Sequence, residues 1–392
     1  MSKLLQSYLR FWAVKYLSRT HPKIVAVTGS VGKTSTKEAI FEVLKIKFGE
    51  KVRKSEGNLN TETGVPLAVL GFQNTPTNIW GWLPVLVTMP FRSASEPAFE
   101  WLVLELAADK PGDINYLTSF VKPQIAVLTA IGPAHLAAFG SIENIIEEKT
   151  NLLRALPGDG WAVLNVDETQ VRKVSYGGRW RKATFGIENE ADFKASNIQT
   201  QIKNFVPETK CDIQIGKNEI TVVTHTLGQK ANVSAQLAAA AIGHILEIGP
   251  SEIKKGLEKI QPEAHRMNVL RGKNNTVIID DCYNANPVSM NAALDVLKNL
   301  SAKRKIAVLG GMREIGKITN ESHRLMGQYA KEVAIKVVTV GELAKKYEIK
   351  DHFNQTNKAI KYLLNEIQEG DIILIKASRA VGLEKIVEAL KV

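Results

Sequence analysis

The segment KIVAVTGSVGKTSTKEAIFEVLKIKF, residues 23–48, decides the fold of this chain. It predicts a short apolar strand, a glycine-rich turn and a helix in direct succession. In such a unit the backbone N–H groups of the turn point into one concavity at the helix N-terminus, where they bind phosphate. Lys33 then reaches the β- and γ-phosphates of a nucleotide, and the Thr34 hydroxyl binds Mg²⁺. A strict Walker A motif has Gly where Val27 stands, yet the position of GKT between strand and helix favours nucleotide binding over a turn that binds nothing.

Strand-like and helix-like patterns alternate through the rest of the chain. Apolar runs at residues 101–106, 125–129 and 161–165 are separated by helical stretches, which indicates a mostly parallel sheet covered on both faces. Residues 192–226 favour short strands instead. A second alternating series begins with TVIIDD at residues 276–281.

These patterns predict an α/β protein with two domains. We expect a central P-loop ATPase domain with a mostly parallel sheet over residues 23–262 and a C-terminal Rossmann-like α/β domain over residues 263–392, with the boundary near Pro262. At 392 residues the chain is long enough for each domain to bury a core of its own. Residues 1–22 predict a basic amphipathic helix, whose commoner role is to pack against the body and whose less common role is to rest on a membrane surface.

One apolar stretch does not fit the alternation. IWGWLPVLVTMPF, residues 79–91, is too short to span a bilayer and contains Pro84 and Pro90. We favour a buried or capping segment. The alternative is a segment that docks on a membrane or on a partner protein.

The overall charge and the two cysteines limit the class of protein. A net charge of +11 attracts anions, and nucleic acid, an anionic membrane and phosphorylated small substrates all satisfy that preference. The sequence has no dense block of Lys and Arg interleaved with aromatic residues, so we expect no nucleic-acid partner. Cys211 and Cys282 lie far apart without CxxC spacing, and no signal-peptide core precedes residue 23. We therefore expect a cytoplasmic protein with two free thiols.

From about Lys23 to its C-terminus the chain resembles the Mur ligase family, because a series of motifs stands in the order found there. The first of them is the phosphate loop itself, which reads TGSxGKTS after an apolar strand. DDCYNANPVSM, residues 280–290, is the most specific to the members that add D-alanyl-D-alanine. The other matching segments are GNLNTETGVPLAVL (57–70), ELAADKPGDINYL (105–117), IGPAHLAAFGSIENIIEEKTNLL (131–153), AVLGGMREIG…SHRLMG (307–327) and KASRAVGLEKIV (376–387).

The resemblance implies an ATP-dependent ligase that joins a muramoyl-peptide precursor of peptidoglycan to D-alanyl-D-alanine through an acyl phosphate. The implied cofactors are ATP, two Mg²⁺ ions and a carbamate formed on Lys149. The implied catalytic residues are Lys33, Glu105, His135 and Lys149, and the implied metal ligands are Thr34, Glu105, His135 and Lys149. The implied nucleotide-binding residues are Thr28, Gly29, Ser30, Gly32, Lys33, Thr34, Ser35, Asn232, Arg266, Asn284 and Asn286. The implied substrate-binding residues are Asn58, Asn60, Asp281, Tyr283, Ser378 and Arg379.

Taken one by one, several of these residues have plainer interpretations. Glu105 ends an apolar strand at the sheet edge where α/β proteins bind ligands, but a solvated acid at a strand end looks the same. The alternative for His135 is a structural histidine. The alternative for Lys149 is a lysine on a solvent-exposed helix face. Pro287 and Ser289 fit a helix start, so capping explains part of the YNANP motif.

The chain departs from the family pattern in ways that leave other functions open. About two dozen residues precede the phosphate loop, too few for the usual N-terminal domain that grips the UDP portion of the precursor. A related ligase with a different acceptor is therefore an alternative, and an ATP-binding partner subunit without catalysis is another. Ala231 and Ala235 stand near Asn232 where the family has His and a second Asn. Gly311 stands where the family has Asp, and Ala107 and Ala377 stand where it has Gly.

Overall fold

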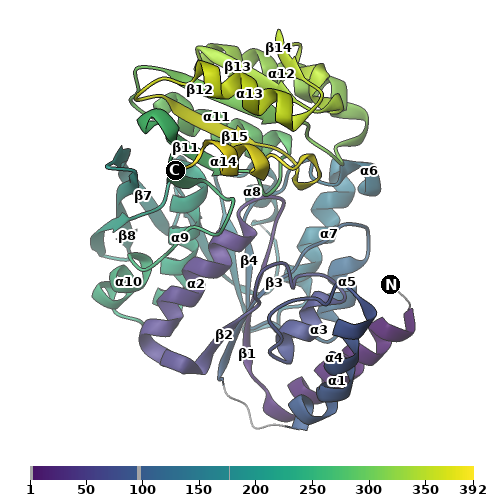
Figure 1. The fold of residues 1–392 in the computed structure, drawn as a ribbon. Coiled ribbons are helices and arrows are strands. Elements are labelled where there is room, and N and C mark those ends of the chain that lie inside the picture. The colour runs from purple at the N-terminus through teal and green to yellow at the C-terminus, as the bar shows by residue number, and fades with distance from the viewer. Residues whose placement is uncertain (1–2, 95–98, 176) are drawn as a thin grey trace.

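Figure 1 shows a computed structural model of the chain, which describes residues 3–94, 99–175 and 177–392. The described residues form one nine-stranded sheet and one six-stranded sheet, each with helices on both faces. The predicted α/β fold class is confirmed.

The first sheet has the strand order β2-β3-β1-β4-β5-β6-β7-β8-β9. Neighbouring strands are parallel from β2 to β7, and β7, β8 and β9 are antiparallel. The last three confirm strands over residues 192–226, but at 11, 10 and 7 residues they are longer than the short strands expected. The strands are β1 (Lys23–Thr28), β2 (Val52–Lys54), β3 (Trp101–Glu105), β4 (Ile125–Leu128), β5 (Trp161–Asn165), β6 (Arg181–Gly186), β7 (Phe193–Lys203), β8 (Val206–Ile215) and β9 (Asn218–Thr224).

Helices cover this sheet on both faces, and β1 shows why its strands are uninterrupted apolar runs. Ile24 and Ala26 point into one core, and Val25 and Val27 point into the other. The first core is covered by α1 (Lys3–Thr20), α3 (Gly64–Val69), α4 (Ile79–Ala94), α5 (Asp113–Thr118), α6 (Leu136–Phe139), α7 (Ile142–Arg154) and α8 (Thr169–Val174). The second is covered by α2 (Lys33–Phe48), α9 (Gln229–Ile245) and α10 (Pro250–Leu257).

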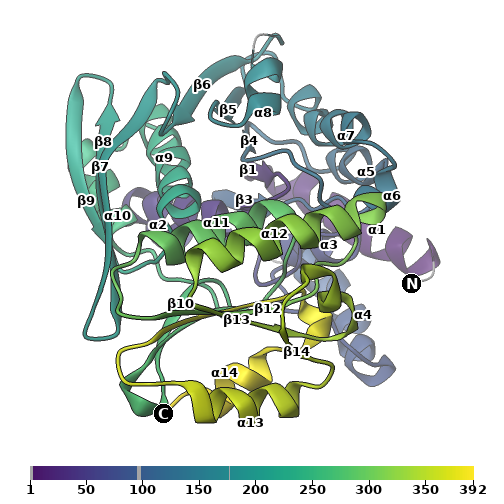
Figure 2. The same cartoon turned by 90° about the horizontal axis from the view of Figure 1, so that it is seen from above.

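The second sheet has the order β10-β11-β15-β12-β13-β14, with β10 antiparallel at one edge. In Figure 2 α11 and α12 lie on the face toward the first domain, and α13 and α14 lie on the opposite face. The strands are β10 (Asn268–Arg271), β11 (Val277–Asp281), β12 (Lys305–Gly310), β13 (Lys336–Val340), β14 (Asp351–Phe353) and β15 (Ile372–Lys376). The helices are α11 (Pro287–Asn299), α12 (Thr319–Val333), α13 (Thr356–Glu366) and α14 (Glu384–Leu390). The chain leaves the first domain between Leu257 and Asn268, and the boundary at Pro262 stays a prediction.

The N-terminal helix packs against the body, as predicted. Leu9, Ala13 and Tyr16 of α1 are buried in the first core. Residues 79–91, in contrast, are not the buried or capping segment that the sequence favours. They belong to α4, in which Val85 and Met89 are buried whereas Trp80 is 79% exposed. That expectation is wrong for the outer face of the helix.

The two prolines of α4 lie inside the helix, and hydroxyl groups donate to backbone carbonyls near them. Pro90 has no N–H to donate to the carbonyl of Leu86, and the hydroxyl of Tyr8 donates to that oxygen at 3.0 Å instead. Thr88 Oγ1 donates to the carbonyl of Pro84 at 2.7 Å. Across the described ranges, every helix is too short or too polar to cross a bilayer.

Candidate active site

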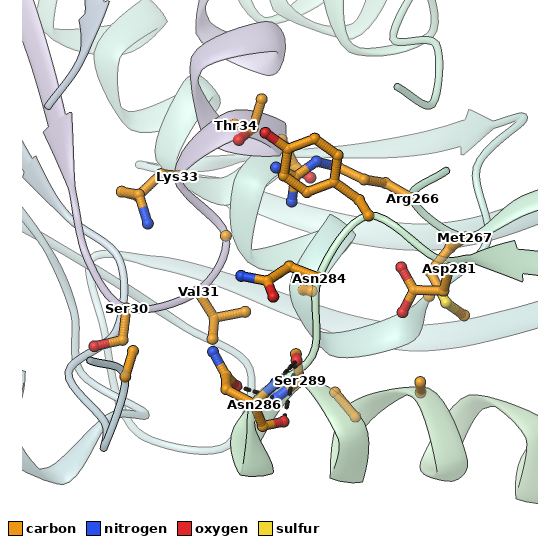
Figure 3. A pocket seen from close by; sticks show the side chains of 18 of the residues that line it. Ser30, Val31, Lys33, Thr34, Arg266, Met267, Asp281, Asn284, Asn286 and Ser289 are labelled. Carbon is orange, nitrogen blue, oxygen red and sulfur yellow. Dashed lines mark hydrogen bonds between the residues drawn. The ribbon is translucent and has the colours of Figure 1, made fainter. Parts of the chain in front are cut away.

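A cavity of about 850 Å³ lies between the two domains (Figure 3). In the first domain it opens at the carboxyl ends of the parallel strands, where α/β sheets bind their ligands. In Figure 3 Ser30, Val31 and Lys33 of the phosphate loop lie across from Asn284 and Asn286 of the second domain. Both domains therefore contribute to one site.

Two glycines give the phosphate loop its shape. A Cβ at Gly29 would lie 2.0 Å from Thr129 Oγ1, so a side chain there would collide with the segment after β4. Gly32 has φ 84° and is the N-cap of α2, a left-handed conformation that glycine adopts without steric penalty. The first residues of α2 line the cavity, so the positive end of the helix dipole is directed at it.

Hydrogen bonds hold the loop in place. Ser30 N donates to the carbonyl of Ala130 at 2.7 Å, and Ser30 Oγ donates to the carbonyl of Gly132 at 2.9 Å. Lys33 Nζ donates to the carbonyl of Gly29 at 2.9 Å, and burial lowers the pKa of Lys33. The hydroxyl of Thr28 donates to a backbone carbonyl after β3, so Thr28 supports the loop from beneath.

Glu105 offers a buried carboxylate to the cavity. It is 2% exposed, and its Oε1 accepts a hydrogen bond from Asn60 Nδ2 at 2.9 Å. Its Oε2 is buried and has no hydrogen-bond partner in the described part of the chain. A buried carboxylate oxygen without a partner is unfavourable, and a bound cation would remove that penalty. Glu105, together with the hydroxyl of Thr34, therefore fits the oxygen ligands that Mg²⁺ prefers.

A metal here would need ligands beyond ordinary carboxylates and imidazoles. In residues 3–94, 99–175 and 177–392 no three or more His, Cys, Asp and Glu side chains gather closely enough to hold an ion. The hydroxyl of Thr34, or an additional anionic group, would have to complete the set.

Lys149 lies on α7 next to this site and is 4% exposed. Burial, and then the positive charge of Lys33, lower the pKa of Lys149 to about 7. Glu148, Asp109 and Glu105 act on the same amine in the opposite direction. This shift favours the neutral amine, which is the form that reacts with CO₂.

His135 connects the two domains. It has φ 55° and is the N-cap of α6. Its Nδ1 lies 2.8 Å from Glu314 Oε2 of the second domain, and its Nε2 lies 3.6 Å from Asp109 Oδ1 of the first. Both ring nitrogens thus face carboxylates, and a metal would have to replace one of these contacts.

The ring of Tyr283 is contacted by two arginines. Arg266 Cζ lies 3.9 Å from the ring centroid, and Arg379 Cζ lies 5.6 Å from it. Arg266 and Tyr283 line the cavity, which leaves positive charge beside the phosphate loop. Such a charge suits a triphosphate or a carboxylate.

Three asparagines of the predicted site also have local structural partners. Asn286 is the N-cap of α11 and accepts a hydrogen bond from Ser289 N at 2.8 Å, as a helix start predicts. Asn284 Oδ1 accepts from the N–H of Ala285 at 2.8 Å, and Asn232 Nδ2 donates to the carbonyl of Leu227 at 2.6 Å. Capping therefore explains part of the YNANP motif.

The structure brings most of the predicted residues to one wall or another of the cavity. Those that line it are Ser30, Gly32, Lys33, Thr34, Ser35, Asn58, Asn60, Glu105, His135, Asn232, Arg266, Asp281, Tyr283, Asn284 and Asn286. Those that lie off its lining are Thr28, Gly29, Lys149, Ser378 and Arg379. Ser378 is buried behind the cavity, where its Oγ donates to the carbonyl of Ala285 at 3.2 Å.

Sequence reasoning missed Lys376. This residue is 2% exposed, lines the cavity, and donates to Asp281 Oδ2 at 2.6 Å and to the carbonyl of Asn284 at 3.0 Å. Asp281 and Lys376 end two strands that pair in register. The sequence does show that Asp281 and Lys376 each end an apolar run. It does not show that these two runs pair as neighbouring strands, so the contact between the two residues could not be predicted.

It also missed three acids that shape the site. Glu314 and Asp109 hold His135, as described above. Glu148 accepts hydrogen bonds from the N–H groups of Gly112 and Ile114 at 2.8 and 2.6 Å, and so fixes the loop that follows Glu105. These contacts join segments that are distant in the sequence.

Comparisons with known proteins agree with this geometry. The Mur ligase middle domain matches residues 27–243, and the Mur ligase, glutamate ligase domain matches residues 265–379. The UDP-N-acetylmuramoyl-tripeptide–D-alanyl-D-alanine ligase of Buchnera aphidicola (subsp. Baizongia pistaciae) is 32% identical over 95% of this chain and 76% of its own length. The ligase of the same name from Bacillus subtilis is 30% identical over 96% and 78%.

Solved structures give the same result. MurF ligase from Thermotoga maritima in complex with ADP has a TM-score of 0.83 at 28% identity, and the match covers 98% of this chain and 83% of that one. MurF from Acinetobacter baumannii has a TM-score of 0.83 at 26% identity, with coverage of 97% and 79%. Since the middle-domain model alone matches more than half of the chain, this protein belongs to the Mur ligase family.

Proposed function

We propose that the chain is an ATP-dependent ligase that forms an amide bond between a UDP-linked muramoyl tripeptide and D-alanyl-D-alanine. The names of its relatives support this activity, and one related structure contains ADP. The observation that carries the proposal is the interdomain cavity, which is lined by Lys33 and Glu105 of the first domain together with Arg266 and Tyr283. We expect the reaction to take place in the cytoplasm, where ATP is available.

The proposed reaction consists of two substitutions. One oxygen of the terminal carboxylate of the tripeptide attacks the γ-phosphorus of ATP, and the bond to the bridging oxygen breaks so that ADP leaves with the electron pair. The amine of D-alanyl-D-alanine then attacks the acyl carbon. Inorganic phosphate leaves with the former carboxylate oxygen, and the amine loses a proton to solvent. The protein forms no covalent bond to substrate in this scheme.

The phosphate loop would stabilise the first step. Lys33 and the first N–H groups of α2 face the position of the terminal phosphates, where negative charge is shared between the attacking and leaving oxygens. Arg266 also lines the cavity, close enough to Lys33 to act on its charge, and adds positive charge.

We propose that two Mg²⁺ ions bind on the side of the cavity that carries Glu105 and His135. Thr34 and Glu105 would hold one, and His135 with a carbamate on Lys149 would hold the other. When bound, Mg²⁺ supplies Lewis-acid stabilisation of the phosphate oxygens. In the proposed modification the neutral amine of Lys149 attacks CO₂, a C–N bond forms and one proton is lost, which changes the side chain from a cation into an anion.

Contacts between the domains would keep water away from the acyl phosphate. Glu314 of the second domain meets His135 of the first at 2.8 Å, close to the loop that carries Asp109. A closed arrangement of this kind aligns the amine with the acyl carbon and slows hydrolysis.

The test is a reconstitution with purified components. ATP, Mg²⁺, UDP-muramoyl tripeptide and D-alanyl-D-alanine should yield ADP, phosphate and a product whose mass corresponds to the new amide. Lys33→Ala should abolish the product, whereas Lys217→Ala, on an exposed turn, should leave it unchanged. ADP release that does not depend on the dipeptide, or no product with this acceptor, would reject the proposal. A panel of other amines and acyl acceptors would then identify a different ligase activity.

A further inference from the structure

The outer side of α4 is an apolar stripe. Ile79, Leu83, Val87 and Phe91 follow one another at intervals of four residues and therefore lie along one side of the helix, and Trp80 lies beside them. Their exposed fractions are 79%, 56%, 58%, 73% and 79% in that order. In a helix of a globular protein such a stripe normally faces the core. Here it faces outward, while Val85 and Met89 on the other side already fill the core.

The first helix extends this surface. Leu4 and Phe11 of α1 are 84% and 57% exposed, and Tyr8 donates a hydrogen bond from its hydroxyl to the carbonyl of Leu86 in α4. Of the thirteen large hydrophobic side chains that are exposed in the described part of the chain, eight belong to these two helices. We call their outer sides together the α1/α4 face. The concentration is larger than the scattered apolar residues of an ordinary surface.

The charged side chains of α1 and α4 have one sign. Neither α1 nor α4 contains Asp or Glu. The cations are Lys3, Arg10, Lys15 and Arg19 of α1 and Arg92 of α4, and Lys3 and Lys15 are exposed. Aromatic and aliphatic side chains combined with lysine and arginine, without acids, are the composition of helices that lie in the interface of an anionic bilayer. Protein interfaces, in contrast, are depleted in lysine.

The position of the face leaves the cavity free. α1 leads into β1 at Lys23, and α4 precedes β3 at Trp101, so both helices lie toward the amino ends of parallel strands whose carboxyl ends carry the cavity. Figure 1 shows α1 and α4 together at the end of the first domain that is far from the second domain. A surface bound to this face would not block access of substrates to the site.

We propose that the α1/α4 face binds the surface of a membrane that contains anionic phospholipids. The apolar stripe of α4 enters the boundary between headgroups and acyl chains, and the exposed Lys3 and Lys15 of α1 meet lipid phosphates. The chain rests on the bilayer rather than crossing it, in keeping with the lengths of the described helices. This interaction does not depend on the ligase activity.

The experiment is flotation of the full chain with vesicles of two compositions. Vesicles of phosphatidylcholine and phosphatidylglycerol in equal parts should carry the protein upward in a density gradient, and pure phosphatidylcholine vesicles should carry much less. The double variant Trp80→Ser/Phe91→Ser should lower the partition coefficient by about tenfold or more, because two exposed aromatic side chains no longer enter the lipid. Lys3→Gln and Lys15→Gln should each lower it about fivefold, and high salt should do the same.

A matched control distinguishes binding through this face from nonspecific adsorption to the vesicles. Leu325→Ser/Ile335→Ser removes two exposed apolar side chains from the second domain, which are 44% and 75% exposed, and should leave flotation unchanged. All substituted side chains are exposed, so circular dichroism should show unaltered melting.

Three results would overturn the proposal. The first is that the wild-type chain does not float with anionic vesicles. The second is that Trp80→Ser/Phe91→Ser floats as well as wild type. The third is that the face is buried in a stable homodimer or in a complex with another protein, which light scattering and loss of the complex in the same variant would reveal.

Discussion

Replacement of Lys149 by methionine tests the electrostatics of the site directly. The amine is 4% exposed, and burial together with the charge of Lys33 lowers its pKa from 10.5 to about 7. Between those values the unfolded chain binds a proton that the folded chain does not bind. The free energy of unfolding of the wild-type protein should therefore rise with pH in this window. The destabilisation caused by burying the protonated amine is fully present below about pH 7.

The size of the effect follows from the shift. Each unit of pKa difference corresponds to about 1.36 kcal/mol. The free energy of unfolding should therefore change by roughly 4–5 kcal/mol over the full pH window between the two pKa values. From pH 7 to pH 9 the wild-type protein should gain about 2 kcal/mol relative to Lys149→Met, since the other titrating groups are shared by both proteins and cancel in the comparison.

Guanidinium unfolding followed by circular dichroism at several pH values, in buffer depleted of CO₂, measures this difference. Lys217→Met is the control, because its side chain lies on an exposed turn and its pH profile should coincide with that of wild type. If Lys149→Met and wild type have parallel profiles, the amine is not perturbed and the carbamate proposal loses its basis. We also expect Lys149→Met to lose ligase activity, and ¹³C-bicarbonate to give a carbamate resonance that only the wild-type protein shows.

Three further changes test other parts of the site. Lys376→Met leaves the largely buried carboxylate of Asp281 unpaired, so the free energy of unfolding should fall by about 3–5 kcal/mol in chemical denaturation, and an unchanged midpoint would contradict this role. Gly29→Ala places a methyl group 2.0 Å from Thr129 Oγ1, so ADP affinity measured by calorimetry should fall by about tenfold or more, and undiminished binding would show that the loop tolerates a side chain. Glu105→Gln removes a charge from the proposed metal site, so turnover should fall by about a hundredfold or more while the melting temperature is kept, and full activity at low Mg²⁺ would exclude this ligand.

The phosphate loop could be predicted from the sequence because its chemistry is local. The run from Lys23 to Lys33 contains the strand, the two shape-determining glycines and the helix start, and the structure has the same order. The alternation of strands and helices likewise predicted both sheets. Glu105 was expected at the carboxyl edge of the first sheet because it ends an apolar strand, whereas His135 was expected in the site only from the family resemblance. Both line the cavity.

Features that depend on distant pairing could not be predicted in this way. The contact of Lys376 with Asp281 requires that β11 and β15 be neighbours in register, although about ninety residues separate them. The contact of Glu314 with His135 requires the relative position of two domains. The outer face of α4 was misjudged because apolar composition normally indicates burial, and the sequence does not show that Val85 and Met89 already occupy the core on the other side.

The central claim is that the cavity joins a tripeptide carboxylate to an amine through transfer of the γ-phosphate. The most direct measurement uses UDP-muramoyl tripeptide with ¹⁸O in its terminal carboxylate, and the inorganic phosphate released during amide formation is analysed by mass spectrometry. We predict that each phosphate carries one labelled oxygen, because that oxygen bridges carbon and phosphorus in the acyl phosphate and leaves with phosphorus. Unlabelled phosphate formed together with the amide would contradict this mechanism.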